Sequence, residues 1–353
     1  MMRKFIKGNE AVTVGALYAG CEIYFGYPIT PASEIAHSAA RLFPQRGKVF
    51  LQAECETGAI NMIYGSASSG RMSMTASSGP GMSLMCEGIS YLAGAQLPAV
   101  IVDVQRAGPG LGNIGPEQGD YNQAVKGGGH GNYKAIVLAP SSVQEMCDLT
   151  IKAFELAYKY RNPVIVLTDA VLGQVMESLE IPEHPFTPPD VSEWAVQADS
   201  KTRKNLITSI YLQNDLQEKH NWLLDAKYAS MSVDAAAKNY RTEDAELILT
   251  GYGSSARIAR SAVDALRAEG IKAGLFRPLT LFPFPQDELR KVAKGRKILV
   301  VELSNGQYRD DVLLHLDRKE FVPVELVNRM GGMLVTTQEV VAAARKMMEA
   351  VEC

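Results

Sequence analysis

Residues 72–104 read MSMTASSGPGMSLMCEGISYLAGAQLPAVIVDV, and the expected fold follows from them. Met72–Ala76 is a short apolar run that favours a strand, and Met82–Gly94 is long enough for a helix. Val100–Val104 is a β-branched run that favours a buried strand. Strand, helix and strand in this order predict a right-handed βαβ unit with parallel strands.

The same alternation continues on both sides of this unit. Short apolar or β-branched runs lie at 22–26, 49–52 and 164–168, and helix-length segments separate them. A second series of the same kind begins at Glu246 and continues to Met348. We therefore expect an α/β protein with two parallel sheets, each covered by helices.

A change of composition separates the two series. Residues 177–244 contain several prolines and both tryptophans, Trp194 and Trp222. We expect a doubly wound domain over residues 1–176, a linker or arm over 177–244 that packs on a partner, and a smaller α/β domain over 245–353.

Composition argues against several functions. The formal net charge is −3 and no basic block is present, so we expect no nucleic-acid partner. No run approaches the roughly 18 apolar residues of a membrane span, so we expect a cytoplasmic protein with no membrane partner. The five cysteines include no C-x-x-C pair, so we expect no metal or iron–sulfur site on this chain. Any electron carrier then belongs to another chain.

Polar residues follow four of the predicted strands. Ligands of an open parallel sheet bind beyond the carboxyl ends of its strands, so these segments form the rim where a site is expected. The rim combines a hydroxyl, carboxylates, a Gly/Ser turn and a guanidinium, in the segments Tyr27-Pro28-Ile29-Thr30, Glu54-Cys55-Glu56, Ser77-Ser78-Gly79 and Arg106.

Two interpretations of Glu56 are open. It lies where a strand passes into a helix, and an acid there is favoured by the helix dipole alone. The other interpretation is a buried carboxylate that hydrogen-bonds a ring nitrogen of a cofactor. Glu54 is a second choice for the same role, because it shares the strand and its side chain is less expected to point inward past the strand end.

Arg106 ends a predicted strand and opens a long glycine-rich segment. It is either a surface arginine or an arginine whose guanidinium forms two parallel hydrogen bonds with a substrate carboxylate. Arg106–Tyr133 holds nine glycines, and loops of more than about 15 residues are usually functional or disordered, so we expect a mobile lid. His130 could act as a base, although no acid that would orient it is predictable. Gly251–Ser255 lacks the third glycine of the dinucleotide fingerprint, and we interpret it as an ordinary βα turn.

These motifs resemble a known family. YPITP (27–31), ECETGA (54–59) and TASSGPGMSLMCE (75–87) resemble the alpha subunit of 2-oxoacid:ferredoxin oxidoreductases. RAGPGLGN (106–113) and KGGGHG (126–131) resemble its branched-chain branch, which acts on 2-oxoisovalerate (3-methyl-2-oxobutanoate). The 2-oxoglutarate branch usually has GPSTG in the arginine loop, which this chain lacks.

The resemblance implies a fold and a set of roles. The first domain is then a thiamine-diphosphate-binding, pyrimidine-type sheet domain, and the second, with RPLTLFP at 277–283, is similar to the transketolase C-terminal domain. Glu56 falls where the family holds the aminopyrimidine ring, Thr30 where a threonine faces the substrate, and Arg106 where an arginine binds the 2-oxoacid carboxylate. The remaining positions implied for cofactor binding are Tyr27, Pro28, Ile29, Ser77 and Ser78.

The resemblance also implies partners. The family's Gly-Asp-Gly motif for pyrophosphate and magnesium is absent, as are iron–sulfur cysteines. Thiamine diphosphate is therefore expected to be shared with a companion beta subunit that holds Mg²⁺, while gamma and iron–sulfur delta subunits, coenzyme A and ferredoxin complete the reaction. The expected reaction converts branched-chain 2-oxoacids to acyl-CoA and CO₂. The alternatives are a 2-oxoglutarate or pyruvate enzyme, a non-catalytic assembly subunit, and a transketolase-type transferase.

Overall fold

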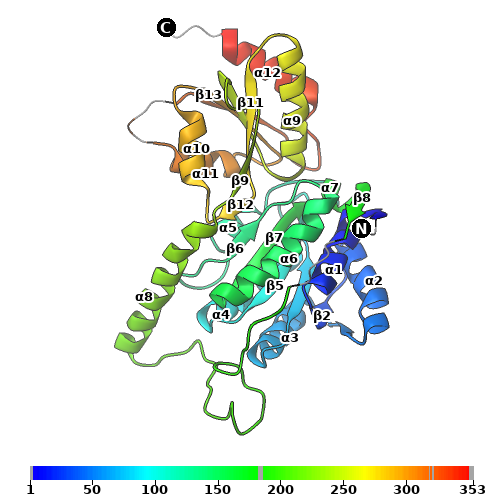
Figure 1. Cartoon of the computed structure of the whole chain (residues 1–353), viewed down its shortest axis with the longest axis vertical. Helices are drawn as coiled ribbons and strands as arrows, with labels where there is room; N and C mark the ends of the chain where they lie inside the picture. Colours follow the sequence, from blue (N-terminus) through cyan, green and yellow to red (C-terminus); the bar gives the residue numbers. More distant parts are fainter. Residues whose placement is uncertain (1–2, 182–185, 318, 320–321, 350–353) are drawn as a thin grey trace.

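A seven-stranded sheet forms the larger part of the molecule (Figure 1). The computed structural model describes residues 3–181, 186–317, 319 and 322–349. Every strand of this sheet is parallel to its neighbours except β12, which pairs antiparallel with β6 at the edge. In spatial order the strands are β12 (Thr280–Phe282), β6 (Ile136–Leu138), β7 (Pro163–Asp169), β5 (Ala99–Gln105), β4 (Ser73–Ser77), β2 (Ile23–Gly26) and β3 (Val49–Gln52).

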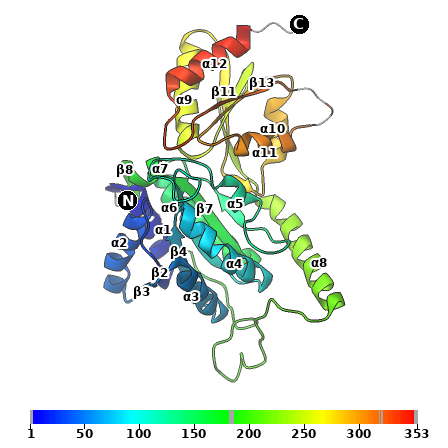
Figure 2. The ribbon, with the colours of Figure 1, turned by 180° about the vertical axis from the view of Figure 1, so that it is seen from behind.

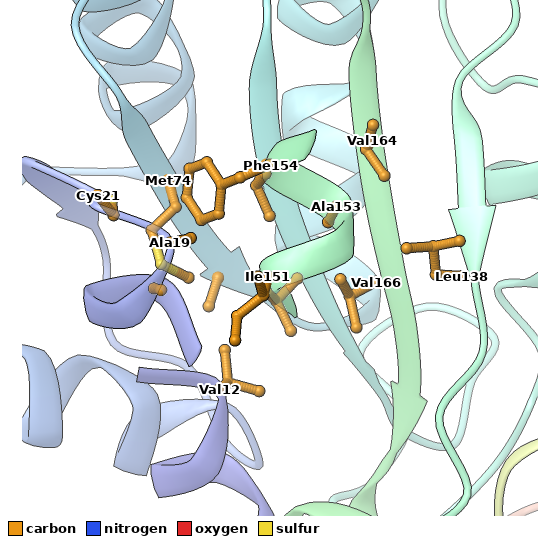
Figure 3. Packing of buried hydrophobic residues seen from close by; sticks show 14 of the residues in the cluster. Val12, Ala19, Cys21, Met74, Leu138, Ile151, Ala153, Phe154, Val164 and Val166 are labelled. Carbon is orange, nitrogen blue, oxygen red and sulfur yellow. The ribbon is translucent and has the colours of Figure 1, made fainter. Parts of the chain in front are cut away.

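Helices cover both faces of this sheet, as a doubly wound fold requires. One core lies under α1 (Gly8–Tyr18), α2 (Ser33–Leu42) and α6 (Val143–Tyr160), and Figure 3 shows its side chains packed between α6 and the strands. The other core lies under α3 (Glu56–Ser68) and α4 (Gly79–Gly94).

The alternation of side chains along β5 decides which residues reach the site. Val100, Val102 and Val104 belong to the core under α1 and α6, whereas Ile101 belongs to the core under α3 and α4. Because successive side chains in a strand point to opposite faces, Asp103 shares the face of Ile101, on the side of α3 and α4.

A second, five-stranded sheet lies at the other end of the molecule (Figure 2). Its strands, in spatial order, are β14 (Val324–Asn328), β13 (Lys297–Glu302), β10 (Leu247–Thr250), β11 (Ala273–Pro278) and β9 (Ala237–Tyr240), with β9 antiparallel to β11. Its two faces are covered by α9 (Gly253–Ala268) with α12 (Thr337–Glu349), and by α10 (Gln286–Ala293) with α11 (Gln307–His315).

The two sheets share one core. The hydrophobic cluster under α3 and α4 continues into α10 and α11. In it the ring of Tyr121, from α5 (Tyr121–Val125), lies 5.5 Å from the ring of Tyr252 and 5.8 Å from that of Tyr308. Tyr121 also donates a 2.7 Å hydrogen bond to Asp311 of α11. The short strand β12 adds a backbone connection between the two halves.

The segment between the two series contains regular structure that the sequence did not reveal. After α7 (Ala170–Gln174), β8 (Met176–Glu180) pairs antiparallel with β1 (Arg3–Lys7). Further on, α8 (Asn214–Ser230) flanks the body in Figure 1 and buries only Leu224 and Tyr228. Two short 3₁₀ turns occupy Pro44–Arg46 and Met231–Asp234.

The α/β class and the two-sheet architecture predicted from the sequence are confirmed. The predicted range of the smaller domain remains a prediction, since it contains β12, whose hydrogen bonds belong to the larger sheet. The sequence also predicts a strand over residues 321–327, and its first residue lies outside the described residues, as does Cys353. Within the described ranges, no helix is long and apolar enough to cross a membrane.

Candidate active site

Glu56 is the first residue of α3 and is buried. Its side chain is 6% exposed, and it makes no hydrogen bond or ion pair to any other described residue. The preceding Cys55 caps the helix, its Sγ accepting a 3.4 Å hydrogen bond from the Gly58 N–H. The residue is buried, but its carboxylate oxygens are not sealed from solvent, so a carboxylate without a protein partner here remains open to hydrogen bonds from a ligand. This environment favours the interpretation of Glu56 as a ligand-binding carboxylate over that of a solvated helix-start acid.

Gly81 makes room for this carboxylate. A Cβ at Gly81 would lie 2.5 Å from Oε1 of Glu56 and closer still to Oγ of Ser77. The Glu56 carboxylate and the Ser77 hydroxyl therefore lie beside each other under the first turn of α4. Oγ of Ser77 and Oγ of Ser78 are both buried and find no partner among the described residues.

Arg106 lies across the rim from these groups and touches Thr30. Its Nη1 donates to the Thr30 carbonyl at 2.9 Å, and its Nη2 donates to the Leu111 carbonyl at 3.0 Å. Its Nε is buried and has no partner in the described chain. A cavity of about 370 Å³ opens here, lined by Gly79, Pro80, Ser83, Arg106, Ala107, Gly108, Pro109, Gly110 and Asp120.

The remaining rim residues divide by exposure. Tyr27, Pro28 and Thr30 are exposed, while Ile29 is half-buried and packs on the core under α1 and α6. The structure therefore places the predicted rim residues on neighbouring strand ends, with Glu56, Ser77 and Ser78 buried and the 27–30 segment open.

Glu54 and His130 are not part of this buried group. The Glu54 side chain is exposed and lies over Gly58 at the start of α3. His130 is also exposed, and its carbonyl accepts a 2.8 Å hydrogen bond from Ser90 on α4. The imidazole lines a separate cavity of about 450 Å³, to which His220 of α8 also contributes.

Side-chain hydrogen bonds at Asn113 and Gln118 anchor the glycine-rich segment, and the expectation of a mobile lid remains a prediction. Gln118 is buried; its Nε2 donates to the Tyr252 carbonyl at 2.9 Å, and its Oε1 accepts from Ser255 Oγ at 2.8 Å and from the Leu303 N–H at 3.0 Å. Asn113 donates to the Gly331 carbonyl at 3.1 Å. The loop that carries Arg106 is thereby fixed to the second sheet.

The turn at Gly251–Ser255 holds an anion from the chain itself. The Ser254 N–H donates a 2.8 Å hydrogen bond to Oδ2 of Asp169, while Oδ1 of Asp169 accepts from the Leu172 N–H at the start of α7. A Cβ at Gly253 would lie 2.6 Å from Asp169 Oδ2. The Ser254 amide of this turn therefore binds a side chain of the first sheet and helps to join the two sheets.

Two acidic residues near Arg106 were missed by the sequence analysis. Asp103 is 1% exposed and both of its carboxylate oxygens lack a described partner, and Oδ2 of Asp120 is likewise buried without one. Burial and then the charge of Asp120 raise the pKa of Asp103 well above its usual range. Burial and then the charge of Glu117 raise the pKa of Asp120 to about 6. A carboxylate inside a β-branched run was the signal that could have revealed Asp103.

The buried groups fit the aminopyrimidine end of thiamine diphosphate. Glu56, Ser77 and Ser78 supply a carboxylate and two hydroxyls that lack partners, and Gly81 leaves the space for a close approach. A carboxylate and two hydroxyls suit hydrogen bonds with the ring nitrogens and the amino group of this ring. Among the described residues, no three His, Cys, Asp or Glu side chains are grouped so as to hold a metal ion.

Fold and site together define a subunit of a thiamine-diphosphate-dependent 2-oxoacid oxidoreductase. Residues 14–244 match the family described as pyruvate flavodoxin/ferredoxin oxidoreductase, thiamine diphosphate-binding. Residues 245–340 match pyruvate:ferredoxin oxidoreductase core domain II. The chain belongs to the 2-oxoacid:ferredoxin oxidoreductase family, as its motifs indicated.

Two curated relatives illustrate the branches of this family. The ketoisovalerate oxidoreductase subunit VorB of Methanothermobacter thermautotrophicus is 58% identical over 98% of this chain and 98% of its own length. The 2-oxoglutarate synthase subunit KorA of Archaeoglobus fulgidus is 39% identical over 95% of this chain and 96% of its own.

Solved structures agree with this assignment. The 2-oxoglutarate:ferredoxin oxidoreductase of Magnetococcus marinus, with 2-oxoglutarate, coenzyme A and succinyl-CoA bound, superposes with a TM-score of 0.90 at 26% identity. The match covers 98% of this chain and 65% of that one. A split-gene transketolase, described as an inactive β4 tetramer, gives a TM-score of 0.61 at 15% identity over 96% of both chains and shares the fold alone.

Proposed function

We propose that this chain is the alpha subunit of a ketoisovalerate:ferredoxin oxidoreductase. The reaction is the oxidative decarboxylation of branched-chain 2-oxoacids, with 3-methyl-2-oxobutanoate as the reference substrate, to acyl-CoA and CO₂ with electrons passed to ferredoxin. The single observation that carries the proposal is the buried, partnerless carboxylate of Glu56 beside Gly81. A carboxylate in this state is suited to hold a ring nitrogen of the cofactor.

Each rim residue then has a separate task. Glu56 binds the aminopyrimidine ring and stabilises the tautomer that the chemistry needs. Ser77 and Ser78 offer hydroxyls to the same ring, and the segment of exposed Tyr27 and Pro28 and half-buried Ile29 covers its edge. Thiamine diphosphate, when bound, supplies the carbon nucleophile that protein side chains lack.

Arg106 binds the carboxylate of the 2-oxoacid. Two of its nitrogens are fixed on the carbonyls of Thr30 and Leu111, which orients the guanidinium, and Nε remains without a partner. A charged hydrogen bond from a pre-oriented arginine contributes about 1.5–3 kcal/mol. The Thr30 side chain is exposed at the same place and faces the bound substrate.

Other components are assigned to companion chains. The sequence has neither the Gly-Asp-Gly motif nor grouped cysteines, so we place Mg²⁺ and the pyrophosphate on a beta subunit and the iron–sulfur clusters on other subunits, including delta. A gamma subunit completes the complex, and coenzyme A and ferredoxin act on the assembled enzyme.

Two observations support the branched-chain branch. Identity is 58% to a ketoisovalerate oxidoreductase subunit and 39% to a 2-oxoglutarate synthase subunit. Leu111, directly after the cavity-lining Gly110, is apolar and exposed, which suits an aliphatic substrate better than a second carboxylate.

The test is substrate preference in the assembled complex. The chain is co-purified with its companion subunits, and viologen reduction is measured with 2-oxoisovalerate, 2-oxoglutarate and pyruvate in the presence of coenzyme A. We expect the highest kcat/KM with 2-oxoisovalerate. A strong preference for 2-oxoglutarate or pyruvate would overturn the branch, and transfer of a carbon fragment between sugars without viologen reduction would indicate a transketolase-type transferase.

A further inference from the structure

We propose that Asp103 and Asp120 form a carboxyl–carboxylate pair that keeps a single proton at neutral pH and controls how strongly Arg106 binds the 2-oxoacid carboxylate. This inference rests on the proposed function, and it assigns to both residues a positioning role that acts through Arg106. It adds two residues to the site that the sequence motifs do not mark.

The two carboxyl groups come together under the first turn of α4. Asp103 points to the α3 and α4 side of β5, and Asp120 is the last residue of the anchored loop before α5. The Gly79 N–H at the start of α4 lowers the pKa of both, by less than burial raises it. A Cβ at Gly79 would lie 3.8 Å from Asp120 Oδ2 and 3.8 Å from Arg106 Cγ, so the acid and the arginine meet at this point.

Unpaired polar atoms at this place indicate a functional cluster. Both oxygens of Asp103 and one of Asp120 are buried without a described partner. Ser77, 1% exposed, is directly opposite Asp103 in the β4–β5 register, and its Oγ also lacks a partner. A buried polar atom without a partner is destabilising, so a group of them is expected where a ligand or a protein–ligand proton network completes the bonding.

Two buried acids so close together do not both ionise. The Coulomb repulsion of a second charge in a buried site is large, and such pairs titrate in two separate steps. Burial and the neighbouring carboxylates raise the pKa of Asp103 well above its usual range and the pKa of Asp120 to about 6. The pair therefore loses one proton near pH 6 and keeps the other at neutral pH.

The charged and titratable groups that face Asp120 define the effect on Arg106. They are Asp103 on β5, Arg106 after it, Glu117 on the loop, Cys86 on α4 and Tyr252 at the start of α9. The one full positive charge in this set is Arg106, with Glu117 and Asp120 beside it. Because a folded-state pKa of about 6 lies above the usual value, Asp120 is neutral below pH 6 and negative above it. An ionised Asp120 weakens the attraction of Arg106 for a substrate carboxylate.

The first experiment is the pH dependence of KM for 2-oxoisovalerate in the assembled complex. We expect KM to rise by about fivefold to tenfold between pH 5.5 and 7.5, as estimated for two charges separated by a few ångströms of partly screened protein. Asp120→Asn removes the titration and should give a low KM that does not change with pH, with kcat altered less than KM. Asp148→Asn on α6, an acid outside the site, serves as the control and should keep the wild-type profile. A profile in Asp120→Asn that matches wild type would overturn the proposal.

The second experiment does not depend on turnover. Infrared difference spectra of the complex at pH 7.5, wild type minus Asp103→Asn, should contain the carbonyl stretch of a protonated carboxyl group. If Asp103→Asn fails to assemble, the wild-type difference between pH 5 and 7.5 should show the loss of one carboxyl band that is missing in Asp120→Asn. Absence of these bands refutes the pair even in an active enzyme. If the bands are present but the complex does not reduce viologen with any of the 2-oxoacids tested, the proposed function is refuted instead.

Discussion

At the scale of the residue, the central feature is a carboxylate that the fold buries without a partner. Glu56 starts α3 below the first turn of α4, and Gly81 supplies the space it needs. A ligand that donates to the carboxylate supplies the hydrogen bonds that the protein itself does not make to it. The residue is therefore prepared for a cofactor ring rather than for the stability of the chain.

Replacing Glu56 tests its role directly. Glu56→Gln keeps the shape but removes the charge, and we expect kcat of the assembled complex to fall by about 10²–10⁴-fold, the range for one proton-transfer partner. The matched control is Glu54→Gln, two residues earlier and exposed, which should stay within a factor of about three of wild type. Equal activity of Glu56→Gln and wild type would indicate a non-catalytic assembly subunit.

Gly81 gives a second test at this scale. In Gly81→Ala the new Cβ would lie 2.5 Å from Glu56 Oε1, so the carboxylate must move. Overpacking costs about 1–3 kcal/mol, which corresponds to a loss of cofactor affinity on the order of tenfold or more. Isothermal titration of the complex with thiamine diphosphate measures this loss. Gly65→Ala on α3, where the new Cβ meets nothing within 4 Å, is the control and should bind normally.

The predictability of the site has a physical limit. Glu56, Thr30 and Arg106 could be selected because they follow predicted strands, and parallel strands end at one rim. Asp120 could not, because its position depends on how the anchored loop folds back against β5. Asp103 was visible as a charge in an apolar strand, but only the alternation of cores along β5 shows that it points toward α4.

At the scale of the element, the loop that carries Arg106 depends on the second sheet. The Gln118 side chain makes three hydrogen bonds there, to Tyr252, Ser255 and Leu303. In this way the second sheet positions an arginine that lies at the rim of the first. Catalytic geometry and the packing between the sheets are therefore linked.

Gln118→Ala measures this link. The substitution leaves the Leu303 N–H and the Ser255 hydroxyl without their partner and removes one of two donors to the Tyr252 carbonyl, and we expect the free energy of unfolding to fall by about 2–4 kcal/mol. Urea unfolding monitored by circular dichroism gives this number. KM for the 2-oxoacid should rise as well, because Arg106 loses its support. Gln217→Ala, whose only bond is to Asn221 on the same helix, should change neither quantity by much.

The ion pair between α6 and β11 makes a pH-dependent contribution. Glu145 binds Arg277 through two hydrogen bonds of 2.7 and 2.9 Å and binds Lys238 at 2.7 Å. Burial raises the pKa of Glu145, but Arg277 and Lys238 outweigh it and lower the pKa to about 2. Because the unfolded value is about 4.3, the contribution is complete above that pH and is lost as the pH falls toward 2.

The expected result is a smaller acid sensitivity in Glu145→Gln. The variant should lose about 3 kcal/mol at neutral pH, since Arg277 is left buried without its carboxylate. Urea unfolding at pH 7 and pH 3 should show wild type losing more stability than the variant over this interval. Equal losses in both proteins would show that the ion pair does not titrate with folding.

Regular elements were predictable where they have a clear period and flanking turns. The bounds of β3 agree with the run at 49–52 in the sequence analysis, because it lies between turn residues. By contrast β12 is three residues long and forms only because β6 offers a free edge. Helix α8 was missed since it buries few side chains and therefore shows little amphipathic pattern.

At the scale of the whole molecule, exposed apolar side chains of the arm suggest a missing partner. Leu206, Leu212 and Trp222 are 80%, 84% and 66% exposed. Such a group of large apolar residues usually marks an interaction site. We propose that residues 206–223 pack on a companion subunit.

Trp222→Ser tests this docking. We expect at least about a tenfold weaker association with the companion subunits, as for loss of an interface aromatic, while the melting temperature of this chain stays unchanged. Analytical ultracentrifugation of mixed subunits measures the association. Leu313→Ser on α11, an exposed apolar residue outside the arm, is the matched control. Normal assembly of Trp222→Ser would place the interface elsewhere.

The most direct test is an experimental structure of the assembled complex with thiamine diphosphate bound. The account predicts that a Glu56 carboxylate oxygen lies within hydrogen-bonding distance, about 2.6–3.2 Å, of a pyrimidine ring nitrogen, with Ser77 and Gly81 against the same ring. A pyrimidine ring bound away from Glu56, with that carboxylate still unpaired, would contradict it.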